Sequence, residues 1–253
     1  MSIDELQRLA EQGDTGAMIE LANQIYDGED YLKIEEATSW ELRAAEAGSV
    51  AGVMRSITGC NLLACINLLP SISDWQEALR YARLSIHWSN VALKEIQLDE
   101  EDFQLVNNTQ IESRYYCGLC NYFLQDYKAA MLAVQDLAEP RAVVLYGASA
   151  YGSEMPNRLE IAYRFLSQIE RDNGYLMAEK EHYEDAILSI AACELSVYYR
   201  VGLPNVAPLN MEHAVSLLNR VLAGLKDDTA REMIQRELKK YQKKLFGGYK
   251  YIG

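Results

Sequence analysis

Four cysteines are the residues whose type and spacing best suit metal or thiol chemistry. Cys117 and Cys120 form a CxxC pair, and Cys60 and Cys65 could supply two further thiolates. A four-thiolate zinc site needs ligands that converge tetrahedrally, whereas this CxxC falls within a predicted helix. Free cysteine behaves as a small apolar residue, so packing in the core is the favoured interpretation. A zinc or thiol enzyme is the weakest alternative.

The other reactive side chains form no catalytic pattern. The histidines His87, His182 and His213 are far apart in the sequence, and no HExxH, phosphate-binding glycine loop or GxSxG motif occurs. The acidic run 99–102 is not spaced like a calcium-binding loop, so we expect it to open a helix. The sequence therefore predicts a protein that is not an enzyme, with no catalytic residues, no cofactor and no metal site.

Tyrosines are the most distinctive feature: there are 17, of which 11 lie between residues 115 and 199. Tyr26, Tyr122 and Tyr151 each follow a small residue by four positions, and Arg200 holds the equivalent place after Ser196. These side chains either pack between helices, as most aromatic stripes do, or line a binding groove. The predicted groove residues are Asn23, Tyr26, Tyr115, Tyr122, Tyr151 and Arg200.

The elements that must position these residues are helices, because apolar residues recur every three or four positions. Capping residues and glycines mark frequent helix ends. The predicted helices are 2–12, 14–27, 33–47, 49–69, 74–96, 104–124, 126–138, 140–152, 157–172, 180–200, 210–224 and 228–246. Short connections should pack neighbours antiparallel, and we expect looser breaks at 97–104 and 173–180.

One predicted hairpin recurs along the chain. Its positions are Ala17, Leu21, Ala22, Tyr26, Ala37 and Trp40. Residues of the same character stand 125 positions later: Ala142, Tyr146, Gly147, Tyr151, Ala162 and Phe165. The small residues should let paired helices approach closely, and the bulky residue at Trp40 should fill the space between successive hairpins.

The segment from Gly13 to Gly48 resembles a Sel-one-like repeat, a relative of the tetratricopeptide repeat. The matching residues are Gly13, Asp14, Ala17, Leu21, Ala22, Gly28, Glu36, Ala37, Trp40, Ala44, Ala45 and Gly48. The segment from Tyr116 to Ala130 is similar to a tetratricopeptide unit, and the segment from Gly202 to Ala214 resembles the family's inter-helix loop.

This resemblance implies an all-α, right-handed α-solenoid of about five to six antiparallel hairpins, with about twelve helices in one repeat domain over 1–253. The expected units are 2–48, 49–96, 104–138, 139–172 and 180–224. The resemblance further implies a concave face that binds a protein or peptide, as a scaffold or adaptor.

The net charge of the chain limits the classes of partner that it can bind. The net charge of −13 argues against nucleic acid and against an anionic membrane surface. Residues 1–50 hold 12 acids and 3 bases, a net charge of −9. This polarity supports a second hypothesis, an immunity-type acidic inhibitor that neutralises a basic toxin or enzyme.

The two termini and the most apolar stretch indicate where the protein is located. The first residues are not patterned as a secretory signal, and the apolar stretch 60–69 is shorter than the ~20 residues that span a membrane. We therefore expect a cytoplasmic scaffold protein of bacterial origin. The basic segment 226–246 is predicted to be a capping helix or, alternatively, a membrane or partner helix. The tail 247–253 either folds back on this cap or serves as a binding peptide.

Overall fold

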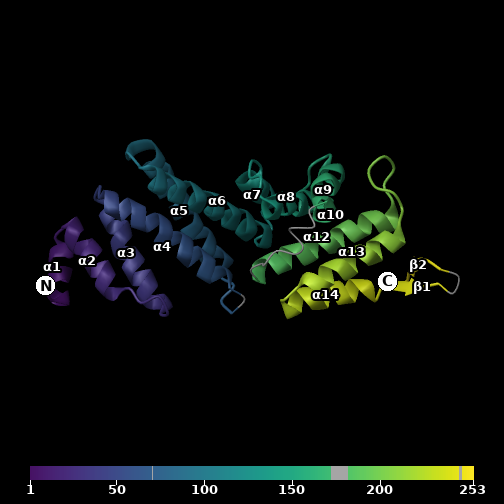
Figure 1. The fold of residues 1–253 in the computed structure, drawn as a ribbon, viewed down its shortest axis with the longest axis horizontal. Coiled ribbons are helices and arrows are strands. Elements are labelled where there is room, and N and C mark those ends of the chain that lie inside the picture. Colours follow the sequence, from purple (N-terminus) through teal and green to yellow (C-terminus); the bar gives the residue numbers. More distant parts are fainter. Residues whose placement is uncertain (70, 172–181, 245–246) are drawn as a thin grey trace. The chain divides into compact units, whose positions relative to one another are not determined.

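The structure, a computed structural model, describes residues 1–69, 71–171, 182–244 and 247–253 (Figure 1). The chain divides into two compact units, unit 1 (Met1–Cys120) and unit 2 (Asn121–Gly253). In the described residues both units are built from helices, with one two-stranded sheet near the C-terminus. The predicted all-α class is confirmed.

Unit 1 consists of consecutive helices joined by short loops. They are α1 (Ile3–Glu11), α2 (Thr15–Ile25), α3 (Tyr31–Glu46), α4 (Val50–Leu68), α5 (Trp75–Glu95) and α6 (Glu100–Phe123), whose last turn enters unit 2. Each of the first four helices packs against the next one. The expected break at 97–104 is shorter than predicted, because Asp99 accepts a hydrogen bond from the Asp102 amide and opens α6.

Local signals in the sequence explain most helix ends. N-terminal side chains accept hydrogen bonds from the first-turn amides at Ser2, Asp14, Asp30, Ser49, Asp74, Asp126, Asn210 and Asp227. Gly13 and Gly48 adopt φ values of +94° and +86° just after α1 and α3. A residue with a Cβ is strained in this conformation, so glycine stops both helices there.

The core at the N-terminus joins three helices. Trp40 of α3, 9% exposed, packs in one cluster with Leu6 of α1 and with Met18 and Leu21 of α2. The Arg43 guanidinium lies 4.1 Å from the Trp40 ring centre. Trp40 therefore fills the space among α1, α2 and α3, on the N-terminal side of its own hairpin.

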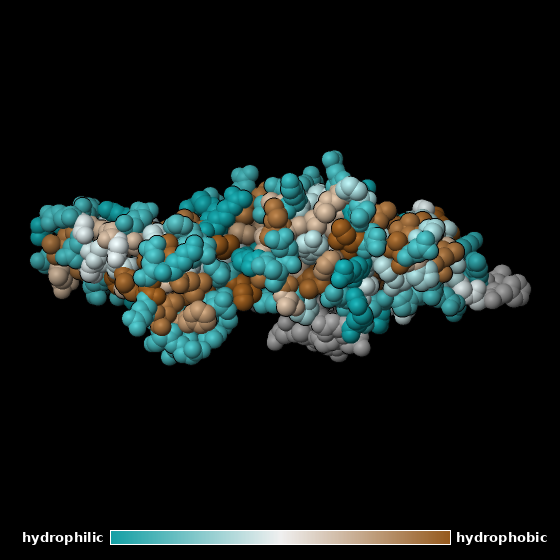
Figure 2. All heavy atoms as spheres, turned by 90° about the horizontal axis from the view of Figure 1, so that it is seen from above, coloured by the Kyte–Doolittle hydropathy of each residue, from teal (hydrophilic) through white to brown (hydrophobic). Residues whose placement is uncertain are grey.

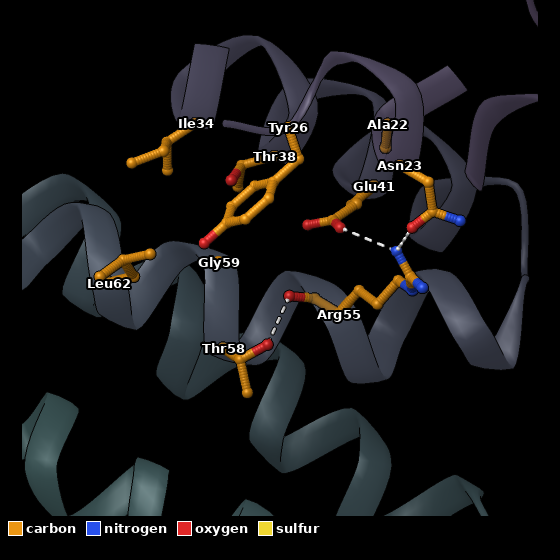
Figure 3. A pocket seen from close by; sticks show the side chains of 10 residues that line it. All are labelled: Ala22, Asn23, Tyr26, Ile34, Thr38, Glu41, Arg55, Thr58, Gly59 and Leu62. Carbon is orange, nitrogen blue, oxygen red and sulfur yellow. Dashed lines mark hydrogen bonds and ion pairs between the residues drawn. The ribbon is translucent and has the colours of Figure 1, made fainter. Parts of the chain in front are cut away.

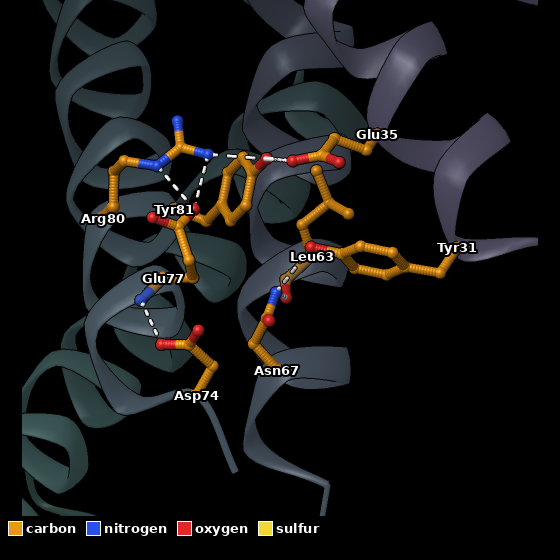
Figure 4. Close-up of polar contacts among 8 residues, drawn as sticks. All are labelled: Tyr31, Glu35, Leu63, Asn67, Asp74, Glu77, Arg80 and Tyr81. Atoms are coloured by element: carbon orange, nitrogen blue, oxygen red, sulfur yellow. Dashed lines mark hydrogen bonds and ion pairs between the residues drawn. The ribbon is translucent and has the colours of Figure 1, made fainter. Parts of the chain in front are cut away.

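A polar network ties α3, α4 and α5 together (Figure 4). The Tyr81 hydroxyl of α5 donates to Glu35 of α3 at 2.6 Å, and Arg80 stacks over the Tyr81 ring at 4.0 Å. Asn67 of α4, which is buried, donates to the Tyr31 hydroxyl and to a backbone carbonyl of its own helix. These contacts fix the crossing of the three helices.

Unit 2 continues with shorter helices. They are α7 (Tyr127–Val134), α8 (Pro140–Gly152), α9 (Arg158–Leu166), α10 (Gln168–Arg171), α12 (His182–Val201), α13 (Met211–Gly224) and α14 (Asp228–Leu238). α8 packs between α7 and α9, and α12 contacts α8, α13 and α14. The predicted helix 157–172 is thus two short helices, and the predicted break at 173–180 lies outside the described residues.

The small residues of the repeat pack closely, as the sequence predicts. A Cβ added to Gly147 of α8 would lie 3.0 Å from the backbone nitrogen of Leu166 in α9. Ala162 of α9 and Ala214 of α13 are fully buried at the equivalent place in their hairpins. Small residues therefore do allow the paired helices of unit 2 to approach closely.

The predicted C-terminal helix was wrong over residues 239–244. The capping helix expected over 226–246 ends at Leu238, and β1 (Tyr241–Lys243) pairs antiparallel with β2 (Tyr249–Tyr251). The Tyr241 and Tyr251 rings meet edge to face at 5.5 Å, and Arg200 stacks over Tyr251 at 3.8 Å. Of the two alternatives for the tail 247–253, the structure shows the folded-back one.

Hydrophilic residues cover most of the face drawn in Figure 2, and hydrophobic residues emerge between them in patches. In the described part of the chain, α4 is long and apolar enough to cross a membrane by length and composition. In this fold α4 packs against α3 and α5, and buried residues such as Ile57 and Leu63 make it a core helix of unit 1.

Candidate functional site

A groove of about 440 Å³ opens on unit 1 where α2, α3 and α4 meet (Figure 3). The residues that line it are Ala22, Asn23, Tyr26, Ile34, Thr38, Glu41, Arg55, Thr58, Gly59 and Leu62. Two of them, Asn23 and Tyr26, belong to the groove predicted from the sequence. We therefore take this groove as the candidate site.

Helix geometry explains why these residues share one surface. Arg55, Thr58 and Leu62 are spaced by three and four positions, so they form one stripe along α4. Tyr26 is the residue that ends α2, with ψ of 126°, and its ring is 53% exposed. The chain turns away from the helix axis at Tyr26, which leaves the ring over the groove (Figure 3).

Gly59 sets the depth of the groove. A Cβ at this position would lie 2.8 Å from the Thr38 hydroxyl oxygen and 3.0 Å from Oε2 of Glu41. Both distances are shorter than ordinary contacts, so the missing side chain at Gly59 lets these α3 side chains lie close against α4. Thr38 and Glu41 consequently form the floor.

The floor carries one linked polar cluster. Glu41, with a side chain 13% exposed, forms an ion pair with Arg55 at 3.5 Å. The same Arg55 nitrogen donates a hydrogen bond to Oδ1 of Asn23. Burial raises the pKa of the Glu41 carboxyl above its ordinary value, and the Arg55 guanidinium offsets only part of that rise. The groove therefore combines a poorly solvated carboxylate with the aromatic and aliphatic walls of Tyr26 and Leu62.

The other predicted tyrosines do not line this groove. Tyr115 has no exposed surface, so its predicted place on a groove was wrong: the ring belongs to the core. Tyr122 and Tyr151 are half-buried and make edge-to-face contacts, with Tyr127 at 5.5 Å and Tyr198 at 6.0 Å. These contacts favour the alternative in which the two rings pack between helices.

Arg200 is engaged by the C-terminal hairpin. Its side chain is 19% exposed, stacks on Tyr251 and lies 4.0 Å from Glu237. This hairpin was not predicted from the sequence, so Arg200 was expected to lie on an open surface. In the structure Arg200 holds β2 against α12.

Of the residues that line the groove, Glu41, Arg55 and Leu62 are among those that were not predicted from the sequence. The i, i+3 and i+7 spacing of Arg55, Thr58 and Leu62 on one face of α4 is the signal that could have shown part of it. Glu41 follows the repeat residue Trp40 directly, but nothing in the spacing shows that its carboxylate meets Arg55.

All five cysteines are free thiols, of which Cys65 and Cys193 are half-buried and the other three are buried. Cys60, Cys117 and Cys120 are each 5% exposed or less, which confirms the packing interpretation. Burial raises the pKa of Cys60 and of Cys117 to about 12, and the neighbouring Glu41 carboxylate adds to the rise at Cys60. In the part of the chain that the structure describes, no group of three or more His, Cys, Asp or Glu residues is arranged to hold a metal ion.

A second hollow, of about 550 Å³, lies in unit 2 beside α9, α10 and α12. One of its lining carboxylates, Glu170, accepts hydrogen bonds from the Tyr199 hydroxyl at 2.6 Å and from Arg220 at 3.0 Å, and Nε2 of His213 lies 2.7 Å away. These neighbours satisfy Glu170, so the cluster braces helices of unit 2.

Comparisons with known proteins give one partial similarity. No family model matches the chain, and no solved structure matches it. A stretch of 72 residues is 31% identical to the Protein OS-9 homolog of Schizosaccharomyces pombe. This stretch is 28% of the chain and 23% of that relative, so the chain spans less than a quarter of the protein it matches.

Proposed function

We propose that the chain is a non-enzymatic protein-binding module, a right-handed α-solenoid similar to Sel-one-like and tetratricopeptide repeats. It holds a peptide or an extended segment of a partner protein in the groove of α2, α3 and α4. Consecutive helices that pack against one another in unit 1 and the repeated small residues of unit 2 support the repeat architecture.

The observation that carries the binding role is the exposed Tyr26 ring beside the Glu41–Arg55–Asn23 cluster. Tyrosine and arginine are enriched among residues that dominate binding energy, because they combine large contact area with a polar end. A groove with one aromatic wall and fixed polar groups suits recognition of side chains. It offers shape and hydrogen bonds without a reactive group.

The test is a selection of random dodecapeptides displayed on phage, made against the whole chain and against Tyr26→Ala. We expect enriched peptides whose affinity falls by about tenfold or more in Tyr26→Ala, as for a central hot-spot residue. Leu32→Ala is the matched control, because Leu32 is 70% exposed in the same hairpin and does not line the groove. Equal binding by Tyr26→Ala and Leu32→Ala would remove the groove from the proposal.

The acidic N-terminal region favours a second candidate, an immunity-type inhibitor of a basic toxin or enzyme. Twelve acids against three bases in residues 1–50 would accelerate association with a basic protein. Salt separates the two candidates. Association of an inhibitor should slow steeply as ionic strength rises, whereas the loss of affinity caused by Tyr26→Ala in the groove should persist at high ionic strength.

A further inference from the structure

We infer that the groove selects a basic side chain, Arg or Lys, flanked by an apolar residue in the bound segment of the partner. This inference rests on the proposed function and specifies the chemistry of the partner. Its basis is the placement of Glu41, the composition of the groove walls and the charge of the surrounding helices.

Glu41 is the anchoring group. Its carboxylate lies on the groove floor with 13% of the side chain exposed, close to Gly59 of α4. Of the described residues that line the groove, Arg55 is the one base, and its nitrogen is shared between Glu41 at 3.5 Å and Asn23. A single shared contact leaves most of the carboxylate's hydrogen-bonding capacity for a second cation.

The walls suit the stem of a long basic side chain. The Tyr26 ring and Leu62 border the same groove as the Glu41 carboxylate (Figure 3). Arg and Lys bury their methylene groups against apolar surface while the charged end reaches a polar partner, and an aromatic face attracts the cation. An apolar neighbour in the peptide would contact Leu62, which is 37% exposed.

The field around the groove has the matching sign. α2 and α3 carry the acids Glu20, Glu35, Glu36 and Glu46 in addition to Glu41, and residues 1–50 hold a net charge of −9. A segment rich in Arg or Lys is drawn to such a surface, whereas an acidic segment is repelled.

The experiment compares the phage selection on the parent chain with selections on Glu41→Gln and on Glu36→Gln. Glu36 is exposed on the same helix and does not line the groove, so its variant makes the same charge change away from the site. We expect peptides from the parent and from Glu36→Gln to be enriched in Arg or Lys beside an apolar residue. Glu41→Gln should keep the apolar enrichment and lose the basic one.

A double-mutant cycle makes the test independent of any effect on folding. In one selected peptide the basic residue is replaced by Gln, and affinities are measured for the parent chain and for Glu41→Gln. We expect the replacement to weaken binding about tenfold with the parent and less than about threefold with Glu41→Gln. An equal loss with both chains, or no basic enrichment, overturns the inference.

The outcomes separate this inference from the proposed function. Peptides that bind through Tyr26 but show no preference for Arg or Lys leave the proposed groove intact and refute its basic specificity. Absence of any peptide sensitive to Tyr26→Ala refutes the proposed groove itself.

Discussion

A Cβ built on Gly52 of α4 would lie 2.5 Å from the backbone nitrogen of Ala45 in α3. The same Cβ would lie 2.7 Å from the carbonyl carbon of Ala44. These are backbone atoms, so they cannot move aside as the end of a side chain can. Gly52 and Gly59 are seven residues apart on the same face of α4, and together they bring α3 close enough to form the floor of the groove.

Gly52→Ala should therefore destabilise unit 1. Alanine gains up to about 1 kcal/mol over glycine in helix propensity, but the clash should cost about 2 kcal/mol or more. Urea unfolding measures the balance, which we expect to be a net loss. Gly16→Ala is the control, because a Cβ there meets only the Asp14 carboxylate of its own helix start, at 3.2 Å. A Gly52→Ala chain as stable as the parent would contradict the observed crossing.

Trp40→Ala should cost about 3–5 kcal/mol, because it empties the cluster shared by α1, α2 and α3. In repeat proteins each unit couples mainly to its neighbours, so the loss should appear first as local opening of residues 5–70. Hydrogen exchange followed by mass spectrometry resolves this region. Trp40→Phe, which retains an aromatic ring, should lose less. Uniform loosening of the whole chain would contradict local coupling.

The buried cysteines should resist thiol reagents in the folded chain. A pKa of about 12 at Cys60 and Cys117 lowers the thiolate fraction at neutral pH by roughly a thousandfold relative to an ordinary thiol. Labelling with a disulfide reagent should be slow before urea unfolding and fast after it. The half-buried Cys65 and Cys193 should react sooner than the buried three, and Cys65→Ser should remove only the Cys65 part of this early labelling. Rapid labelling of Cys117 under native conditions would refute its burial.

Helix positions could be predicted because their determinants are local. Asp14, Ser49 and Asp74 each cap a helix through an amide three residues later, which is a relation visible in the sequence. The C-terminal hairpin was missed because Tyr241 continues the apolar spacing of α14. The glycines at 247 and 248, between two short alternating segments, were the available turn signal.

The groove could be predicted only in part. Tyr26 follows from the repeat register, which places equivalent residues on one helix face, and Asn23 is its predicted neighbour in the groove. The contact between Arg55 and Asn23 joins residues 32 positions apart and depends on how closely α3 lets α4 approach. Such pairs arise from tertiary packing, so spacing along the chain does not show them. Tyr115 illustrates the converse error, since a tyrosine in the sequence of a helix can be a core ring as readily as a groove ring.

Glu194 of α12 is a buried carboxyl in unit 2. Its Oε2 atom is out of contact with solvent and has no hydrogen-bond partner among the described residues. Its neighbours include Tyr122 and Tyr198, whose own pKa values are raised by burial and by the Glu194 charge. Burial raises the pKa of Glu194 to about 8. The folded chain therefore holds this proton at pH values where the unfolded chain has released it.

This difference predicts how stability depends on pH. Below the ordinary glutamate pKa of about 4.3, both states are protonated and the group costs nothing. As pH rises from there to about 8, Glu194 loses its proton in the unfolded chain but keeps it in the folded chain. This deprotonation stabilises the unfolded chain, so the free energy of unfolding falls. Glu194→Gln should remove this part of the slope and exceed the parent in stability by about 1–4 kcal/mol at pH 9. Urea unfolding across pH 5–9 measures it, with the exposed Glu154→Gln as control. Parallel curves for the parent and Glu194→Gln would show that the carboxyl is solvated.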